Sequence, residues 1–335
     1  MVNIGIIGYG YWGPNLVRNF AAQAEGKVVK VADARPERLN LLHKNYPSIQ
    51  GVKTAEEIIQ DTGIDAVVIA TPVFSHYPLA KAALLNGKHV MIEKPMTASV
   101  KEAEELIELA ESKNLVLMVD HTFLYTGAVQ KMKELIDANS IGKPRYFDST
   151  RINLGLFQPD INVLWDLAPH DISILTFLIK ERPYSINATG VSHTHNGIEN
   201  IAYMTVNYAH DFIAHFNCSW TSPVKIRQTL IGGDTKMIVY NDLDPSEKVR
   251  IYDTGFTHKT EEDKFHIRVD YRTGDVNIPK LAEKEALAGV AKDFLTSILE
   301  QKQPTSNAAL GIEVVRILEA SQESIRNKGK EVVIQ

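Results

Sequence analysis

The first third of the chain alternates short apolar runs with stretches that carry apolar residues at helical spacing. The apolar runs cover residues 2–7, 28–32, 64–70, 88–92 and 115–119. Strands that are apolar on both faces are typical of a buried parallel sheet, because helices cover both faces of such a sheet. The pattern therefore predicts an α/β fold with a doubly wound domain over residues 1–121.

Residues 122–335 show a different pattern. Helical spacing over 128–138 gives way to strand patterns from about 185 to 271, and two further amphipathic helices follow. Between residues 212 and 220 every second position is apolar, which predicts a strand with one buried face and one available face. We expect residues 122–335 to form a second domain built on an antiparallel sheet.

Composition narrows the classes of function. A chain of 335 residues, 44% of them hydrophobic, suggests two cores, and a net charge of −5 gives no indication of a nucleic-acid partner. The one cysteine, Cys218, supports neither a disulfide framework nor a thiolate metal cluster. No export signal and no apolar run near ~18 residues is visible, so we expect a cytoplasmic protein without a membrane partner.

A glycine-rich motif follows the first predicted strand. Gly8, Gly10 and Gly13 match G-x-G-x-x-G, in which the glycines allow a tight turn, close approach of a pyrophosphate and packing of helix on strand. The next helix would direct its N-terminal N–H groups at the phosphates. Asp33 ends the next apolar run, where a ribose-binding acid is expected, so the residues predict a dinucleotide site rather than an empty turn.

The same stretch bears on the choice of cofactor. Tyr11 and Trp12 lie inside the motif, so we expect them beside the cofactor as well. Asp33 should accept hydrogen bonds from a ribose hydroxyl and repel a 2′-phosphate, which favours NAD over NADP. Arg35 and Arg38 could pair with such a phosphate, so NADP use stays possible.

Polar residues follow the C-terminal ends of the later strands of this domain. They are Thr71-Pro72, Glu93-Lys94 and His121. Ligands bind at that edge of doubly wound sheets, and a buried lysine can have a pKa near neutrality, so Lys94 is a candidate for proton transfer. The bond between Lys94 and Pro95 could be cis. A surface ion pair between Glu93 and Lys94 is the competing interpretation.

Asp166 and His170 are four residues apart, just before an apolar run. A helix that begins at or near Asp166 would place both side chains on one face, with Pro169 in its first turn. A carboxylate and an imidazole on one face suit proton transfer near neutral pH. The alternative is an aspartate that caps the helix and a histidine with a structural partner.

Other polar residues could contact a substrate. Arg151 lies upstream of the Asp–His pair, and Lys225 and Arg227 would project from one strand face, toward an anionic substrate or toward water. His193 and His195 could share a face, but no nearby acid or cysteine completes a metal site, so we expect no metal.

These motifs together resemble the glucose–fructose oxidoreductase/inositol dehydrogenase (Gfo/Idh/MocA) family. The matching pieces, in chain order, are Gly8-x-Gly10-x-x-Gly13, Ala70-Thr71-Pro72 with His76, Glu93-Lys94-Pro95 and Asp166-x-x-x-His170. The resemblance implies an N-terminal Rossmann domain and a C-terminal α/β domain with a large, mostly antiparallel open-faced sheet. It also implies NAD(P)-dependent oxidation of sugars, cyclitols or nucleotide sugars.

Roles for individual residues come with the resemblance. Lys94 and His170 would be catalytic, and Asp166 would help to shape the site. The nicotinamide side would be lined by Thr71, Pro72, His76 and Glu93, and His121 would lie with the substrate. The resemblance further suggests homodimers or homotetramers that assemble through the open sheet.

Two segments indicate a branch of the family. Residues 165–171 and 218–227 resemble the branch that acts on nucleotide-linked amino sugars, although Ser173 stands where a second aspartate is often found. The expected reaction is oxidation of the C3 hydroxyl of a nucleotide-linked hexosamine by NAD⁺. A dehydrogenase of a free sugar or inositol, and a non-catalytic cofactor-sensing protein, are the alternatives.

Overall fold

The computed structural model describes residues 1–155, 157–257 and 270–334. They fall into two compact units: unit 1 is Met1–Thr126 with Lys284–Arg316, and unit 2 is Gly127–Glu283 with Ile317–Gln335. Our division at residues 121 and 122 left 284–316 in the second domain, whereas the structure groups this segment with the first. The reason is packing in the core of unit 1, described below.

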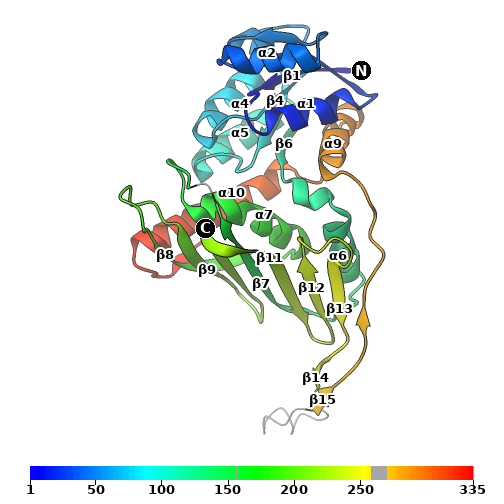
Figure 1. The fold of residues 1–335 in the computed structure, drawn as a ribbon, viewed down its shortest axis with the longest axis vertical. Coiled ribbons are helices and arrows are strands. Elements are labelled where there is room, and N and C mark those ends of the chain that lie inside the picture. The colour runs from blue at the N-terminus through cyan, green and yellow to red at the C-terminus, as the bar shows by residue number, and fades with distance from the viewer. Residues whose placement is uncertain (156, 258–269, 335) are drawn as a thin grey trace. The chain divides into compact units, whose positions relative to one another are not determined.

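Unit 1 is built on a six-stranded parallel sheet in the order β3-β2-β1-β4-β5-β6 (Figure 1). The strands are β1 (Val2–Ile7), β2 (Gly26–Ala32), β3 (Gln50–Val52), β4 (Ala66–Ile69), β5 (His89–Glu93) and β6 (Leu117–Asp120). This order reverses between β1 and β4, as in dinucleotide-binding folds. The predicted doubly wound sheet is therefore confirmed.

Helices connect and cover these strands. They are α1 (Gly13–Ala21), α2 (Pro36–Asn45), α3 (Glu56–Ile59), α4 (His76–Leu85), α5 (Val100–Ser112) and α9 (Ala286–Glu300), with 3₁₀ turns η1 (Val73–Ser75) and η2 (Thr122–Tyr125). Ser99 caps α5, since its hydroxyl accepts a hydrogen bond from the Glu102 N–H at 3.3 Å.

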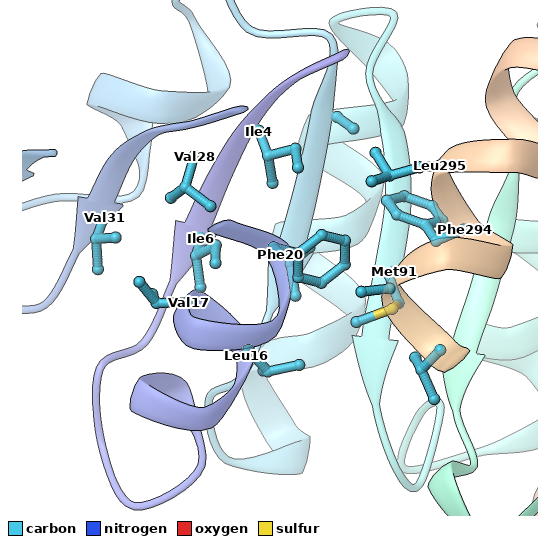
Figure 2. Packing of buried hydrophobic residues seen from close by; sticks show 14 of the residues in the cluster. Ile4, Ile6, Leu16, Val17, Phe20, Val28, Val31, Met91, Phe294 and Leu295 are labelled. Carbon is cyan, nitrogen blue, oxygen red and sulfur yellow. The ribbon is translucent and has the colours of Figure 1, made fainter. Parts of the chain in front are cut away.

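The core of unit 1 joins the two ends of the sequence (Figure 2). Phe20 of α1 and Phe294 of α9 are fully buried, and their rings meet edge to face with centroids 6.2 Å apart. Leu295, also fully buried, packs close to Gly26 of β2, where an added Cβ would lie 2.9 Å from its side chain. Helix α9 therefore completes this core although it is distant in the sequence.

Unit 2 is built on a nine-stranded sheet in the order β16-β13-β12-β11-β7-β10-β9-β8-β17. The strands are β7 (Pro144–Leu154), β8 (Pro183–Val191), β9 (Ile201–Tyr208), β10 (Ile213–Ser219), β11 (Thr221–Gly233), β12 (Met237–Asn241), β13 (Val249–Tyr252), β16 (Val276–Asn277) and β17 (Val332–Val333). Strands β7 and β10 are parallel and the other pairs antiparallel, so the mostly antiparallel sheet is confirmed.

The remaining elements complete unit 2. Helices α6 (Gly127–Asp137) and α7 (Val163–Leu178) belong to it, and α10 (Ala308–Arg326) starts in unit 1 and ends in unit 2. Strands β14 (Gly255–Thr257) and β15 (Asp270–Arg272) pair in a separate ribbon. Residues 258–269 of the predicted strand region lie outside the described part of the chain.

The sheet of unit 2 has one covered and one open face. Helix α7 packs on β7, β9 and β10 (Figure 1). On β10, Ala214 and Phe216 are fully buried whereas Ile213 is 47% exposed. The alternation predicted for residues 212–220 is therefore confirmed.

Helix α7 begins earlier than we expected. Asn162 is its N-cap, since the side-chain oxygen accepts hydrogen bonds at 3.1 Å from the N–H groups of Leu164 and Trp165. The helix starts at Val163 rather than at Asp166 itself, because the three apolar residues after Asn162 are buried and belong to the helix. Pro169 is consequently inside the helix rather than in its first turn.

No helix among the described residues combines the length and the apolar character needed to cross a membrane.

Replacing Phe294 tests whether α9 is part of the first core. We expect Phe294→Ala to lower the free energy of unfolding by about 3–5 kcal/mol, because it leaves a cavity beside Phe20. Urea unfolding followed through tryptophan fluorescence measures this loss. Leu299→Ala is the control on the same helix, since Leu299 is 52% exposed. Equal effects of the two substitutions would contradict the assignment of α9 to this core.

Candidate active site

The glycine-rich turn between β1 and α1 contains two glycines that the fold itself requires. Gly8 has φ +100°, and an added Cβ would lie 2.4 Å from the Ala70 carbonyl oxygen. A Cβ on Gly13 would lie 2.3 Å from the Gly8 carbonyl oxygen. Side chains at these two positions would therefore collide with the backbone of the turn.

Gly10 differs from these two glycines because, within the part of the chain that the structure describes, the space beside it is open. The nearest atom to a Cβ there would be Nη2 of Arg35 at 3.5 Å, an ordinary contact. The space beside Gly10 lies before the N-terminus of α1, where N–H groups and the helix dipole favour an anion. The turn thus fits a pyrophosphate that approaches the backbone closely.

Asp33, at the end of β2, is buried and bonded on both oxygens. Its Oδ2 accepts from the Tyr9 N–H and from Nη2 of Arg35, and its Oδ1 accepts from the Arg35 N–H and Nε, all at 2.9–3.0 Å. Burial acts to raise the pKa of Asp33, but these hydrogen bonds outweigh it and the pKa lies below its usual value. Asp33 is therefore ionised, and the half-exposed Arg35 is its ion-pair partner.

Arg38 is a half-buried residue of α2, and Tyr11 is 91% exposed on the glycine-rich turn. No contact in the described chain links either residue to Asp33, so their expected place beside a cofactor stays a prediction.

His76 connects the loops that follow β4 and β5. Its Nε2 lies 2.7 Å from the Thr71 carbonyl oxygen and its Nδ1 lies 2.9 Å from the Pro95 carbonyl oxygen. Burial lowers the pKa of His76, although its hydrogen bonds to backbone carbonyl groups act in the opposite direction. Thr71 is also bonded through its hydroxyl to Ser75 at 2.7 Å. The Lys94–Pro95 peptide is cis, as the sequence suggested.

Two carboxyl groups end β5 and β6 side by side. Glu93 and Asp120 are register partners in the parallel pair, and Lys94 follows Glu93 directly. Burial, and then the charge of Asp120, raise the pKa of Glu93 to about 8, although Lys94 acts in the opposite direction. Burial also raises the pKa of Asp120. Lys94 thus lies beside two acids that resist ionisation.

Asp120 also connects β6 to the glycine-rich turn. Its Oδ1 accepts from the Thr122 hydroxyl at 2.7 Å, and its Oδ2 accepts from Nε1 of Trp12 at 3.4 Å. Trp12 is the N-cap residue of α1. Asp120 was not predicted from the sequence as a site residue. Only its contact with the distant Trp12 distinguishes it from other residues at strand ends.

His121 is 1% exposed, and neither of its ring nitrogens has a hydrogen-bond partner among the described residues. Burial and the charge of Lys94 lower the pKa of His121 to about 3. A neutral imidazole offers one donor and one acceptor, and buried polar atoms are rarely left unused. His121 could therefore bind a polar group of a ligand.

In unit 2, helix α7 carries Asp166 and His170 one turn apart. Nε1 of Trp220 donates to Oδ2 of Asp166 at 2.9 Å. Phe157 stacks on the buried Trp220 ring, with centroids 5.6 Å apart. The carboxylate is thus held in place on the helix face it shares with His170. Trp220 was also not selected from the sequence, where it is only one apolar residue of an alternating strand.

Arg151 forms a buried ion pair on the covered side of the sheet. Its Nε and Nη2 donate to the two carboxylate oxygens of Asp171, both at 2.7 Å. Burial works against the charged form, but Asp171 raises the pKa of Arg151 above its usual value. Two donors of the guanidinium are therefore committed to Asp171, and the expected substrate contact of Arg151 stays a prediction.

Arg227 lies opposite Arg151 in the register of β7 and β11. Its Nη1 makes a long contact of 3.4 Å with Asp242, and its Nε is buried without a hydrogen-bond partner among the described residues. Lys225 is exposed two residues earlier on the same strand. Arg227 therefore keeps a buried donor that a ligand could use.

We expected His193 and His195 to bind no metal. The Nδ1 atom of His193 lies 2.8 Å from the side-chain oxygen of Asn200. Within the described ranges, no three His, Cys, Asp or Glu side chains are grouped so as to hold a metal ion.

Comparison with protein families gives two adjacent matches. Residues 2–121 match the family model described as "Oxidoreductase family, NAD-binding Rossmann fold". Residues 129–239 match the model described as "GFO/IDH/MocA C-terminal domain". The glycine-rich turn, Asp33 and the Glu93–Lys94 pair all lie within the first match, which makes unit 1 an NAD(P)-binding domain.

The names of similar proteins give different substrates. UDP-N-acetylglucosamine 3-dehydrogenase of Acidithiobacillus ferrooxidans is 32% identical over 212 residues, 61% of this chain and 63% of that relative. scyllo-Inositol 2-dehydrogenase (NADP(+)) IolW of Bacillus subtilis is 26% identical over an alignment of 355 positions, 98% of this chain and 94% of that relative.

A solved structure of the UDP-N-acetylglucosamine 3-dehydrogenase of Acidithiobacillus ferrooxidans has the same fold. It superposes with a TM-score of 0.82 at 23% identity, over 98% of this chain and 99% of that one. At this identity the likeness bears on the fold.

Gly10 gives a direct test of the cofactor cradle. We expect Gly10→Ala to weaken NADH binding by about tenfold or more, because the methyl group fills the space of the approaching phosphate. Fluorescence titration with NADH measures the affinity. Stability to urea should stay unchanged, since the added Cβ makes only an ordinary contact.

Gly13→Ala is the contrasting variant and should lose stability as well as binding, because its Cβ meets backbone at 2.3 Å. Wild-type NADH affinity in Gly10→Ala would show that this turn does not hold the pyrophosphate.

Proposed function

Because the chain belongs to the Gfo/Idh/MocA family of oxidoreductases, we propose that it oxidises the C3 hydroxyl of a nucleotide-linked amino sugar with NAD⁺. The observation that carries the proposal is the setting of Lys94. This lysine follows the end of β5, beside two acids of raised pKa and an imidazole whose nitrogens have no hydrogen-bond partner among the described residues. Such a setting favours proton transfer over a structural role.

The cofactor supplies the hydride acceptor when it is bound. The turn at Gly10 and the N-terminus of α1 would hold its pyrophosphate. Asp33, kept ionised by Arg35, would accept from the adenosine ribose and disfavour a 2′-phosphate. Arg35 is half-exposed, so it could also turn toward a 2′-phosphate, which keeps NADP within the proposal.

The proton chemistry is assigned to this chain's own side chains. The hydroxyl proton would pass to Lys94 or to His170, while the hydride leaves C3. Asp166 would orient the imidazole of His170, and Trp220 would hold Asp166 by its indole N–H at 2.9 Å. Thr71, Pro72 and His76 would support the loops around the nicotinamide, and His121 would bind a substrate hydroxyl.

The substrate class rests on Arg227 and Lys225. A nucleotide sugar carries a diphosphate, whereas inositol and free sugars are neutral. Arg227 has a buried Nε without a partner in the described chain, and Lys225 is exposed nearby on β11. Cations with unused donors suit an anionic group. The relative that acts on UDP-N-acetylglucosamine supports the same choice.

A free sugar or inositol is the second candidate substrate. The inositol dehydrogenase of Bacillus subtilis aligns over nearly the whole chain, although at lower identity. In that case Arg227 and Lys225 would face solvent and take no part in recognition.

The open face of the unit 2 sheet is proposed as the surface for self-association. Tyr146, Tyr203 and Ile213 expose 38%, 48% and 47% of their surface there. Large apolar side chains gathered on one face are typical of interfaces, and a second copy of the chain presents the same surface. A homodimer or homotetramer is therefore the proposed assembly.

A substrate panel separates the two candidate classes. We expect NADH absorbance to appear with UDP-N-acetylglucosamine and NAD⁺, and to stay near background with myo-inositol or glucose. Arg227→Met should raise the KM for the nucleotide sugar by about tenfold or more, because a charge-assisted contact to the diphosphate is lost. Arg250→Met is the matched control, since Arg250 is 31% exposed and bonded to Asp244. Turnover of myo-inositol alone would support the second candidate.

Lys94→Met tests the proton-transfer residue. We expect kcat to fall by about 10²–10⁴-fold, because general acid–base catalysis contributes that much. NADH affinity, measured by fluorescence titration, should stay close to wild type. Lys101→Met on α5 is the control, since Lys101 is exposed to solvent. Wild-type turnover in Lys94→Met would remove Lys94 from the mechanism.

A further inference from the structure

Glu93 and Asp120 form a pair of acids within the parallel sheet. Register partners in parallel strands direct their side chains to the same face, and neighbouring strands lie about 4.8 Å apart. Asp120 is 1% exposed. Glu93 is partly buried. Two carboxyl groups this close, one of them shielded from water, repel each other strongly when both are ionised.

Hydrogen bonds fix one member of the pair in place. Asp120 accepts from Thr122 and from Trp12, so one of its oxygens is tied to the cap of α1. That cap follows the turn at Gly10 where the pyrophosphate is expected. Asp33 ends β2 on the adenosine side of the sheet, so β5 and β6 end on the nicotinamide side.

Among the described residues, few charged groups lie near Glu93 and Asp120. Lys94 is the nearby cation, and it lowers the pKa values of both acids. His121 is neutral at pH 7 because burial lowers its pKa to about 3, and burial lowers the pKa of His76 as well. On the other side, Tyr125 of η2 is hydrogen-bonded at 2.7 Å to Asp293 of α9, and its own pKa is raised by burial.

We propose that Glu93 and Asp120 hold one proton between them, release it when NAD⁺ binds, and take one up when the cofactor is reduced. The oxidised nicotinamide carries a positive charge and the reduced ring carries none. A positive charge beside the pair stabilises its doubly ionised form, whereas a neutral ring leaves the singly protonated form.

The inference deepens the proposed function, on which it rests only for the source of the hydride. Alcohol and NAD⁺ give ketone, NADH and one proton. The hydride carries the electron pair to the cofactor, and the proton from the hydroxyl passes by way of Lys94 to the carboxyl pair. It would then leave for water when the next NAD⁺ binds. The pair thus stores the product proton inside the enzyme.

The direction of the pH effect follows from linkage. In the cofactor-free chain the pKa of Glu93 is raised to about 8, so the pair keeps its proton near pH 7. NAD⁺ must displace this proton, so its affinity should rise with pH up to about pH 8 and then level off. NADH displaces none, so its affinity should not rise over the same range.

Calorimetry in the absence of any sugar tests the proposal. NAD⁺ and NADH are titrated into the protein between about pH 7 and 8, in two buffers of different ionisation enthalpy. The difference in heat between the buffers gives the protons exchanged. We expect release of a large fraction of one proton per NAD⁺ and no release with NADH. Equal proton exchange for the two cofactors would overturn the proposal.

Three variants identify the group that titrates. Glu93→Gln should abolish the release, and Asp120→Asn should move it to lower pH, because Glu93 then lacks a neighbouring carboxylate. Lys94→Arg should keep the release, since arginine holds the charge and does not titrate in this range. Release that persists in Glu93→Gln but disappears in Lys94→Arg would assign the proton to Lys94 and refute the proposal.

The calorimetry contains no sugar. The number of protons released on NAD⁺ binding therefore does not depend on which sugar the enzyme oxidises. Loss of the proton signal would in turn leave the dehydrogenase assignment standing.

Discussion

The parallel pairing of β5 with β6 is the constraint on which the rest of unit 1 depends. It ends two buried strands at the same level, so that Glu93 and Asp120 are register partners and Lys94 and His121 come next. Charged groups held this far from water repel or stabilise one another strongly. The sheet thereby brings together two acids of raised pKa, a neutral imidazole and one lysine.

In unit 2, contacts between side chains hold the candidate residues in place. Trp220 holds Asp166 on α7, and Asp171 on the same helix pairs with Arg151 of the sheet. A helix tied to its sheet at two successive turns cannot rotate easily. His170 lies on this helix between the two aspartates. The pair at Arg151 is best understood as part of this support.

Local patterns predicted the sheet of unit 1, its glycine-rich turn and the residues at its strand ends, because apolar periodicity and glycine geometry are short-range properties. Packing between residues far apart in the sequence could not be predicted from such local patterns. The return of residues 284–316 to unit 1 depends on Phe294 meeting Phe20, and no periodicity records that contact. Asp120 and Trp220 gain their importance from hydrogen bonds to distant residues. The start of α7 was misjudged because the side chain of Asn162, rather than that of Asp166, accepts the hydrogen bonds of the first turn.

We have proposed that hydride is transferred from C3 of a nucleotide-linked amino sugar to NAD⁺. UDP-N-acetylglucosamine labelled with deuterium at C3 tests it most directly, with the cofactor analysed by mass spectrometry after turnover. The account predicts NADH that carries one deuterium, and slower turnover if hydride transfer limits the rate. Unlabelled NADH formed from this substrate would mean that another carbon is oxidised, and the absence of any NADH would contradict the claim.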